Sequence, residues 1–355
     1  MANAELTMAE ALDHQRAQCA ALGSPLYARI LEGVVDDYQR GGIVGELLDA
    51  RTERPAHDAV PLRLLGAMHR LVLAGHLPDL ARFYPSAGGH DGADPVPAFI
   101  DALALHRHAI ADGLGRPVQT NEVGRAAALA PGFALVAKRT GLPLHLLEIG
   151  SSAGLLLNWD RFCYDTGRSR LGDETSPVRF GPDSWLQPPP DFSGFTIVTE
   201  RRGVDVAPID PTTEDGRLTL LSFVWPDQPQ RFERLEAAID IATRHPSVVD
   251  RGDAGAWAAE HLTTARPGVV TVLHHSIVLQ YLARPSFDRL KDALLDAGRA
   301  ATAAAPIAWL RMEPAGAVAD IRLTMWPGGD DELLGTSGYH GQDVRWLASA
   351  MNSKL

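Results

Sequence analysis

The pattern of apolar and polar positions divides the chain into two regions. Up to about residue 140, alanine and leucine recur at the three- and four-residue spacing of amphipathic helices. These helical runs cover residues 8–42, 59–85, 96–115 and 121–140, and glycine and proline interrupt them. The pattern predicts an all-α N-terminal domain over residues 1–120, followed by one more helix before the first strand.

Short apolar runs alternate with helical runs from residue 144 onward. The predicted strands cover residues 144–150, 217–228, 247–254, 267–276 and 306–314, and amphipathic helices cover 229–245 and 286–304. Strand–helix alternation is typical of βαβ units and a mainly parallel sheet. Two further runs, 320–329 and 332–347, predict an antiparallel pair that closes the sheet. We therefore expect an α/β, Rossmann-like domain over residues 121–355.

One segment does not follow this alternation. Residues 163–216 are rich in proline, glycine and aspartate and contain only short β-like pieces. We interpret this segment as a β-rich insertion between the first helix and the second strand of the α/β domain.

The first predicted strand ends in a glycine loop. Its sequence is Glu148-Ile-Gly150-Ser151-Ser-Ala-Gly154, and a helix is predicted to follow. Glycine lets the backbone approach a ligand closely, and a helix N-terminus favours a negative group. The spacing differs from the G-x-G-x-x-G of dinucleotide folds. The loop is a candidate cofactor contact, and its alternative interpretation is an ordinary strand-to-helix turn.

Acidic residues follow the next two predicted strands. Asp227 follows the second strand and can accept hydrogen bonds from ribose hydroxyls, while Asp253 and Ala254 follow the third and can meet an exocyclic amine. Each aspartate can equally cap a helix or a turn. If residues 161–167 formed the second strand instead, Asp165 would be the ribose acid. Asp173 and Glu174 have the expected spacing but lie in a glycine-rich turn.

The fourth and fifth strand ends supply candidates for proton transfer. His274 and His275 are adjacent, so strand alternation sends them to opposite faces of the sheet. We assign His274 to the cofactor side and His275 to the acceptor's proton as general base. Glu313 ends the fifth strand, where it can meet substrate or form an ion pair.

Four more residues are candidates for substrate binding. Asn121 and Arg125 open the helix before the first strand, and Arg125 can hold a carboxylate through two hydrogen bonds. Tyr281 follows the fourth strand, where core packing is its other interpretation. Arg202 lies in an Arg-Arg pair between acids, for which a self-contained ion-pair network is the alternative.

Composition narrows the classes of partner. The formal net charge is −11, which argues against general binding to nucleic acid or anionic membranes. The sequence shows no signal peptide and no apolar run that could span a bilayer, and its two cysteines are far apart. It also lacks a metal-ligand cluster, a P-loop and a Gly-x-Ser-x-Gly elbow. We expect a cytoplasmic protein with a small-molecule substrate; the oligomeric state stays open, a homodimer included.

The order of these motifs is similar to a known fold. From about Gly124 onward, the glycine loop and the two acids resemble class I S-adenosylmethionine-dependent methyltransferases. The whole chain also resembles an uncharacterised bacterial family called domain of unknown function 2332. That resemblance rests on "VQTNEVGRAAAL", "LLEIGSSAGLLLNWDRF", "ERRGVDVAPID", "VWPDQPQRFERLEAA", "HHSIVLQYL" and "WLRMEP".

The resemblance to methyltransferases implies a cofactor and a reaction. The cofactor would be S-adenosylmethionine, with its methionine end at the glycine loop. The reaction would be in-line methyl transfer to a small-molecule acceptor, with the helical domain as a cap over the site. The alternative function is a non-catalytic sensor or partner subunit that binds the cofactor or a nucleoside.

Overall fold

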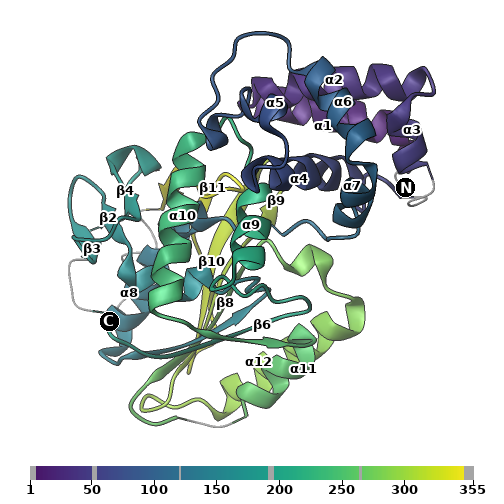
Figure 1. The fold of residues 1–355 in the computed structure, drawn as a ribbon. Helices are drawn as coiled ribbons and strands as arrows, with labels where there is room; N and C mark the ends of the chain where they lie inside the picture. The colour runs from purple at the N-terminus through teal and green to yellow at the C-terminus, as the bar shows by residue number, and fades with distance from the viewer. Residues whose placement is uncertain (1–4, 50–53, 120, 191–195, 264–265, 348–355) are drawn as a thin grey trace. The chain divides into compact units, whose positions relative to one another are not determined.

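A computed structural model describes residues 5–49, 54–119, 121–190, 196–263 and 266–347. The chain forms two compact units, each of which draws on two separate segments. Unit 1 comprises residues 1–120 and 213–233, and unit 2 comprises residues 121–212 and 234–355. Figure 1 shows the helices of unit 1 and the sheet of unit 2.

Unit 1 is helical, as the apolar spacing predicts. Its core combines apolar side chains from most of its helices with Trp225 from the later segment. The helices are α1 (Met8–Ala21), α2 (Pro25–Gln39), α3 (Ile43–Leu48), α4 (Val60–Leu73), α5 (Pro78–Ala81), α6 (Val96–Leu105), α7 (Arg107–Gly113) and α9 (Glu214–Ser222). Helix α9 packs against α4, so unit 1 contains residues from both sides of the 121–212 segment of unit 2.

The predicted second strand, residues 217–228, is wrong. Residues 214–222 form helix α9, whose N-cap Thr213 accepts a hydrogen bond from the Gly216 amide. Glu214 and Asp215 stand in its first turn, where acidic side chains stabilise a helix. A short apolar run fits a buried strand and a buried helix equally well, and here the capping residues favour the helix.

The sheet of unit 2 has nine strands in the order β5-β12-β11-β10-β9-β8-β1-β6-β7. The five strands from β7 to β9 in this order run parallel to one another. They are β7 (Val248–Arg251), β6 (Val198–Asp205), β1 (Leu144–Ile149), β8 (Val270–Ser276) and β9 (Ile307–Ala315). The prediction of a mainly parallel sheet is therefore confirmed, with β6 in the place expected for residues 217–228.

The C-terminal strands run antiparallel. Strand β10 (Val318–Trp326) pairs with β9 and with β11 (Asp331–Ser337), and β11 pairs with β12 (Val344–Trp346). The predicted antiparallel pair is thus present as β10 and β11 within a longer meander. Strand β5 (Trp185–Gln187) adds to the edge, parallel to β12.

Helices cover both faces of the parallel strands. Helices α11 (Ala254–His261) and α12 (Arg284–Ala300) lie side by side and bury apolar side chains of β1 and β8, among them Leu147 and Leu273 (Figure 1). On the opposite face, α8 (Ala126–Thr140) packs on the row that contains His274 and Leu310. Helix α10 (Pro229–Arg244) leads from unit 1 back toward β7.

The predicted insertion is shorter than residues 163–216. Strands β2 (Cys163–Asp165), β3 (Arg170–Gly172) and β4 (Arg179–Phe180) form a separate three-stranded sheet in the order β3-β2-β4. Strands β5 and β6, which follow, belong to the main sheet instead. The segment after β1 is a short 3-10 helix (Leu155–Arg161) with a kink at Asn158, where a longer helix was expected.

Candidate functional site

The strand order places a topological switch point between β1 and β8. From β1 the chain continues to β6 on one side, and from β7 it returns through α11 to β8 on the other side. In open α/β sheets, ligands bind at the carboxyl ends of the strands beside such a point. The candidate site is therefore the edge formed by the ends of β1, β6 and β8.

The glycine loop after β1 has the backbone that its glycines allow. Gly150, Ser152 and Gly154 all have positive φ, at 67°, 52° and 68°. A Cβ atom at Gly150 would lie 2.4 Å from the Cγ2 atom of Val278, which belongs to the loop after β8. Only glycine fits at this position, because both the left-handed backbone and the close approach exclude a side chain.

An acid at the end of β6 holds this loop. The Ser152 amide donates to Asp205 Oδ2 at 2.9 Å, and the Ala207 amide donates to Asp205 Oδ1 at 2.9 Å. The Ser151 amide also donates to the carbonyl of Val204 at 3.1 Å. Asp205 occupies the position expected for Asp227. The sequence analysis missed Asp205 because β6, the strand that follows β1 in the main sheet, lies inside the presumed insertion. The sequence signal for β6 was the alternation of apolar and polar residues around Val204.

Asp227 lies in unit 1 and caps a helix there. Its Oδ1 atom accepts from the Ser24 hydroxyl at 2.6 Å, and its Oδ2 atom accepts from the Leu26 amide at 2.9 Å. Both partners stand at the start of α2. The position predicted for Asp227, at the end of a sheet strand, is therefore wrong.

Glu148 and His274 form a buried pair at the switch point. They are register partners on β1 and β8, so their side chains share the α8 face of the sheet. Glu148 is 3% exposed and His274 is 0% exposed, and His274 Nδ1 lies 4.0 Å from Glu148 Oε1. Within the described residues, Glu148 Oε2 and both ring nitrogens of His274 have no hydrogen-bond partner.

Burial shifts the pKa of both groups toward the neutral form. Desolvation, with help from the charge of Asp205, raises the pKa of Glu148 to about 8, although Ser151 and Arg125 act in the opposite direction. Desolvation also lowers the pKa of His274 to about 3. At neutral pH, the pair is therefore a protonated carboxyl beside a neutral imidazole.

His275 points to the opposite face, so the predicted divergence of the two histidines is confirmed. Its Nδ1 atom lies 2.7 Å from Glu313 Oε1, and the Trp309 indole donates to its Nε2 atom at 2.9 Å. Because an indole N–H can only donate, Nε2 is the acceptor and Nδ1 carries the proton. Both nitrogens of His275 are thus engaged, which leaves no lone pair for the proton-acceptor role predicted for it.

Glu313 organises the loop after β8. Besides His275, it accepts from the amides of Val278 at 3.0 Å and Leu279 at 3.3 Å. This loop carries Val278 against Gly150. Glu313 therefore fixes the approach of the two loops.

Two of the predicted substrate contacts do lie at this edge. The Asn121 side chain donates from Nδ2 to the Ser151 carbonyl at 3.2 Å. The Arg125 guanidinium donates to the carbonyls of Tyr339, at 3.0 Å, and Ser276, at 3.2 Å. The structure thus brings Asn121 and Arg125 to the glycine loop and the end of β8.

The other candidates have different surroundings. Asp253 is the N-cap of α11, where its side chain accepts from the Ala256 amide, and it forms an ion pair with Arg289. Ala254 is the first residue of that helix. Tyr281 is 76% exposed, so it is not a core residue.

Arg202 forms two hydrogen bonds with Asp250 across β6 and β7, at 2.7 and 3.0 Å. Its neighbours are paired as well, Arg201 with Asp160 and Glu200 with Arg266. These charged residues therefore form ion pairs, but their partners lie outside the segment, so the expected self-contained network is replaced by pairs with other elements.

Comparison with known proteins gives one match. The model of the family described as "Uncharacterized protein conserved in bacteria (DUF2332)" matches residues 9–346. The chain belongs to this family. No curated protein and no solved structure gives a significant match.

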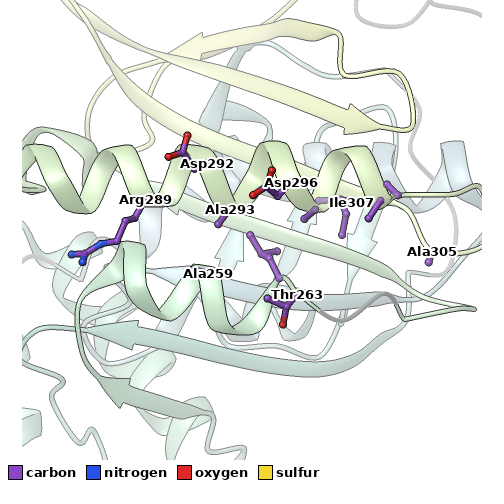
Figure 2. Close-up of a pocket in the computed structure, with 12 residues that line it drawn as sticks. Ala259, Thr263, Arg289, Asp292, Ala293, Asp296, Ala305 and Ile307 are labelled. Carbon is purple, nitrogen blue, oxygen red and sulfur yellow. The ribbon is translucent and has the colours of Figure 1, made fainter.

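This DUF2332 protein also has cavities away from the switch point. A groove of about 490 Å³ lies between α11 and α12, and half of its lining residues are alanines. Figure 2 shows the lining, which also includes the charged residues Arg289, Asp292 and Asp296. The groove reaches Ile307 at the start of β9, so it extends toward the amino edge of the sheet. A smaller cavity of about 260 Å³ lies within unit 1.

Metal and membrane sites receive no support from this DUF2332 structure. Within residues 5–347, outside the gaps in the description, no three His, Cys, Asp or Glu side chains form a metal-binding group. None of the helices described is long and apolar enough to cross a membrane. The switch point therefore remains the best-built candidate site.

Proposed function

We propose that this protein is an S-adenosylmethionine-dependent methyltransferase that acts on a small molecule. One observation carries the proposal: a Glu-x-Gly loop follows the first of five parallel strands, at the switch point, and is bonded to an acid at the end of the next strand. This arrangement resembles that of class I S-adenosylmethionine-dependent methyltransferases. No part of the proposal rests on Asp227.

The residues at the edge suit the parts of that cofactor. Each oxygen of Asp205 accepts one backbone bond and keeps a lone pair, which suits ribose hydroxyls. The backbone of the glycine loop would meet the methionine end, beside the Val278 side chain that packs on Gly150. Arg125, which the carbonyls of Tyr339 and Ser276 hold in place, puts a positive charge at the same edge, and this charge suits a carboxylate.

The hydrogen bonds of His275 and Glu313 restrict the chemical class of the methyl acceptor. A hydroxyl or amine acceptor needs a base for its proton. Both nitrogens of His275 are engaged, and Glu313 is committed to holding His275 and the amides of Val278 and Leu279. An acceptor that is already nucleophilic, such as a thiolate or a carboxylate, needs only alignment with the sulfonium and exclusion of water. We therefore propose a small anionic or thiol acceptor.

The hydrogen bonds of His275 also favour one other candidate function. A protein that binds the cofactor without transferring its methyl group needs no base, and the hydrogen bonds of His275 serve only the fold. The second candidate is therefore a cofactor-binding sensor or partner subunit on this fold.

Isothermal titration with S-adenosylmethionine and S-adenosylhomocysteine tests the proposal. Gly150→Arg fills the loop and Asp205→Ala removes the ribose acceptor, so both should weaken binding at least tenfold, about 1.4 kcal/mol. Arg202→Ala is the matched control on the same strand as Asp205 and should leave the affinity unchanged. If the wild type binds neither compound, the proposal fails; if it binds but transfers no methyl group to thiol or carboxylate acceptors, the sensor is favoured.

A further inference from the structure

The Glu148–His274 pair is the least explained polar feature of unit 2. Its carboxyl oxygen Oε2 and two imidazole nitrogens are fully buried without a hydrogen-bond partner among the described residues. Each such group costs about 1–3 kcal/mol, so native proteins rarely retain one without a purpose. The pair also stands at the switch point, directly before the glycine loop.

The surroundings of the pair explain why the carboxyl stays neutral. On the α8 face, His274 meets the edge of Phe133, whose ring stacks on Trp159 at 4.6 Å. The charged groups that act on Glu148 are Asp205 from β6 and Arg125 from the start of α8, and their opposite charges offset one another. His275 is on the opposite face of the sheet, where the Trp309 indole donates to its Nε2 atom and its Nδ1 atom lies 2.7 Å from Glu313.

A positive group at this edge would change that balance. Its charge favours the ionised carboxylate, which then becomes a strong hydrogen-bond acceptor. A neutral His274 has one N–H, and its Nδ1 lies 4.0 Å from the carboxyl group. A small movement lets His274 donate to the carboxylate and hold it in place.

We propose that Glu148 and His274 together recognise the cationic group of the ligand at the switch point, and that binding releases the Glu148 proton. The O–H bond of the Glu148 carboxyl breaks, its proton passes to the buffer, and the carboxylate faces an ammonium or sulfonium. His274 is a positioning residue that stabilises this carboxylate. The inference rests on the proposed function and adds to it the charge of the ligand and a coupling to pH.

The coupling has a definite sign. In the free protein, the pKa of Glu148 is raised to about 8, so the carboxyl is mostly protonated at neutral pH. Because binding expels the proton, affinity should rise with pH by up to about tenfold per unit below this pKa and level off above it. A ligand without a cation should show neither the proton release nor the slope.

Calorimetry with three probes tests the inference. Binding heats are measured at about pH 7, near the upper part of the sloping range, in phosphate and in Tris, whose ionisation enthalpies differ. S-Adenosylmethionine and its decarboxylated form both carry cations, so their heats should differ between buffers by close to one proton per ligand. Methylthioadenosine is neutral, so its heat should not depend on the buffer. This comparison uses the wild type alone and needs no variant to fold.

Variants then assign the proton. Glu148→Gln should abolish both the proton release and the pH slope, while Glu260→Gln, a matched change at an exposed position of α11, should alter neither. His274→Phe should raise the pKa of Glu148 further, which extends the slope to higher pH; a purely structural role would lower affinity equally at every pH.

The outcomes separate the two proposals. If S-adenosylmethionine binds without proton release, or if Glu148→Gln retains the release, the inference is overturned and the proposed function stands. If no probe binds, both are overturned.

Discussion

Hydrogen-bond partners distinguish residues that serve the fold from residues that can serve a ligand. Asp227 follows an apolar run and Asp205 follows a largely charged one, yet Asp205 lies at the sheet edge and Asp227 caps α2. The sequence was sufficient to place Glu148, Gly150 and Gly154 together at the end of a strand, because neighbours in one loop are also neighbours in space. It was insufficient for Asp205, because the position of an acid at a sheet edge depends on which distant strand pairs with β1.

The cap made by Asp227 leads to a prediction for stability. Asp227→Ala removes the acceptor for the Ser24 hydroxyl and the Leu26 amide, so the free energy of unfolding should fall by about 1–2 kcal/mol. Cofactor affinity should stay unchanged, because both carboxyl oxygens of Asp227 are engaged at the start of α2. Urea unfolding and calorimetry on the full chain provide the two measurements.

Asp101→Ala is a suitable control, because Asp101 is an exposed residue on helix α6. It should change the unfolding free energy by less than about 0.5 kcal/mol. Loss of cofactor binding in Asp227→Ala at full stability would contradict our assignment and restore Asp227 as a ligand contact.

At the scale of elements, the hydrophobic periodicity predicts the overall fold class better than it assigns each segment to a helix or a strand. The alternation of helices and strands gave the parallel sheet, β7, β8, β9 and the β10–β11 pair at nearly their observed positions. It assigned residues 217–228 to the wrong element, because apolar runs of eight residues fit both periods. It also failed to identify β6, which lies within a segment rich in turn-forming residues.

The antiparallel meander contains a charged cluster that should tune its stability with pH. Asp331 on β11 accepts from Arg311 on β9 at 2.6 Å and from Arg322 on β10 at 3.0 Å. Burial by itself raises the pKa of Asp331, but the hydrogen bond from Arg322 and the charge of Arg311 outweigh it, so the pKa lies below its usual value.

Asp331→Asn should therefore destabilise the protein at neutral pH. A depressed folded-state pKa means that the ionised group stabilises the fold above its unfolded pKa and loses this effect as pH falls through the folded value. Because the side chain is 40% exposed, solvent screening limits the expected loss to about 1 kcal/mol. Urea unfolding at neutral and acidic pH should show the difference from wild type shrinking below about pH 4. A difference that is independent of pH would show that packing, and not charge, is responsible.

At the scale of the whole molecule, the two units explain why the order of motifs along the chain was misleading. Residues 213–233 leave unit 2 after β6, complete the core of unit 1 and then lead back into unit 2 through α10. The apolar residues of this segment follow the pattern of a strand but belong to another core. Local periodicity contains no information about which core an apolar run joins, so this excursion was not predictable from the sequence.

The division into units gives the last prediction, which concerns ligand-linked stability. A ligand that binds only the folded protein at 100 times its dissociation constant raises the free energy of unfolding by about 2.7 kcal/mol. If S-adenosylmethionine binds at the switch point, amides of β1 and β8 that exchange by global unfolding should slow by this amount, about a hundredfold. Asp205→Ala should lose most of the effect at the same ligand concentration. Amides of α4 provide an internal comparison, because they slow equally if both units unfold together and stay unchanged if unit 1 unfolds alone. Unchanged exchange in β1 and β8 at saturating ligand would place the binding site elsewhere or remove it, because their carboxyl ends form the proposed contact surface.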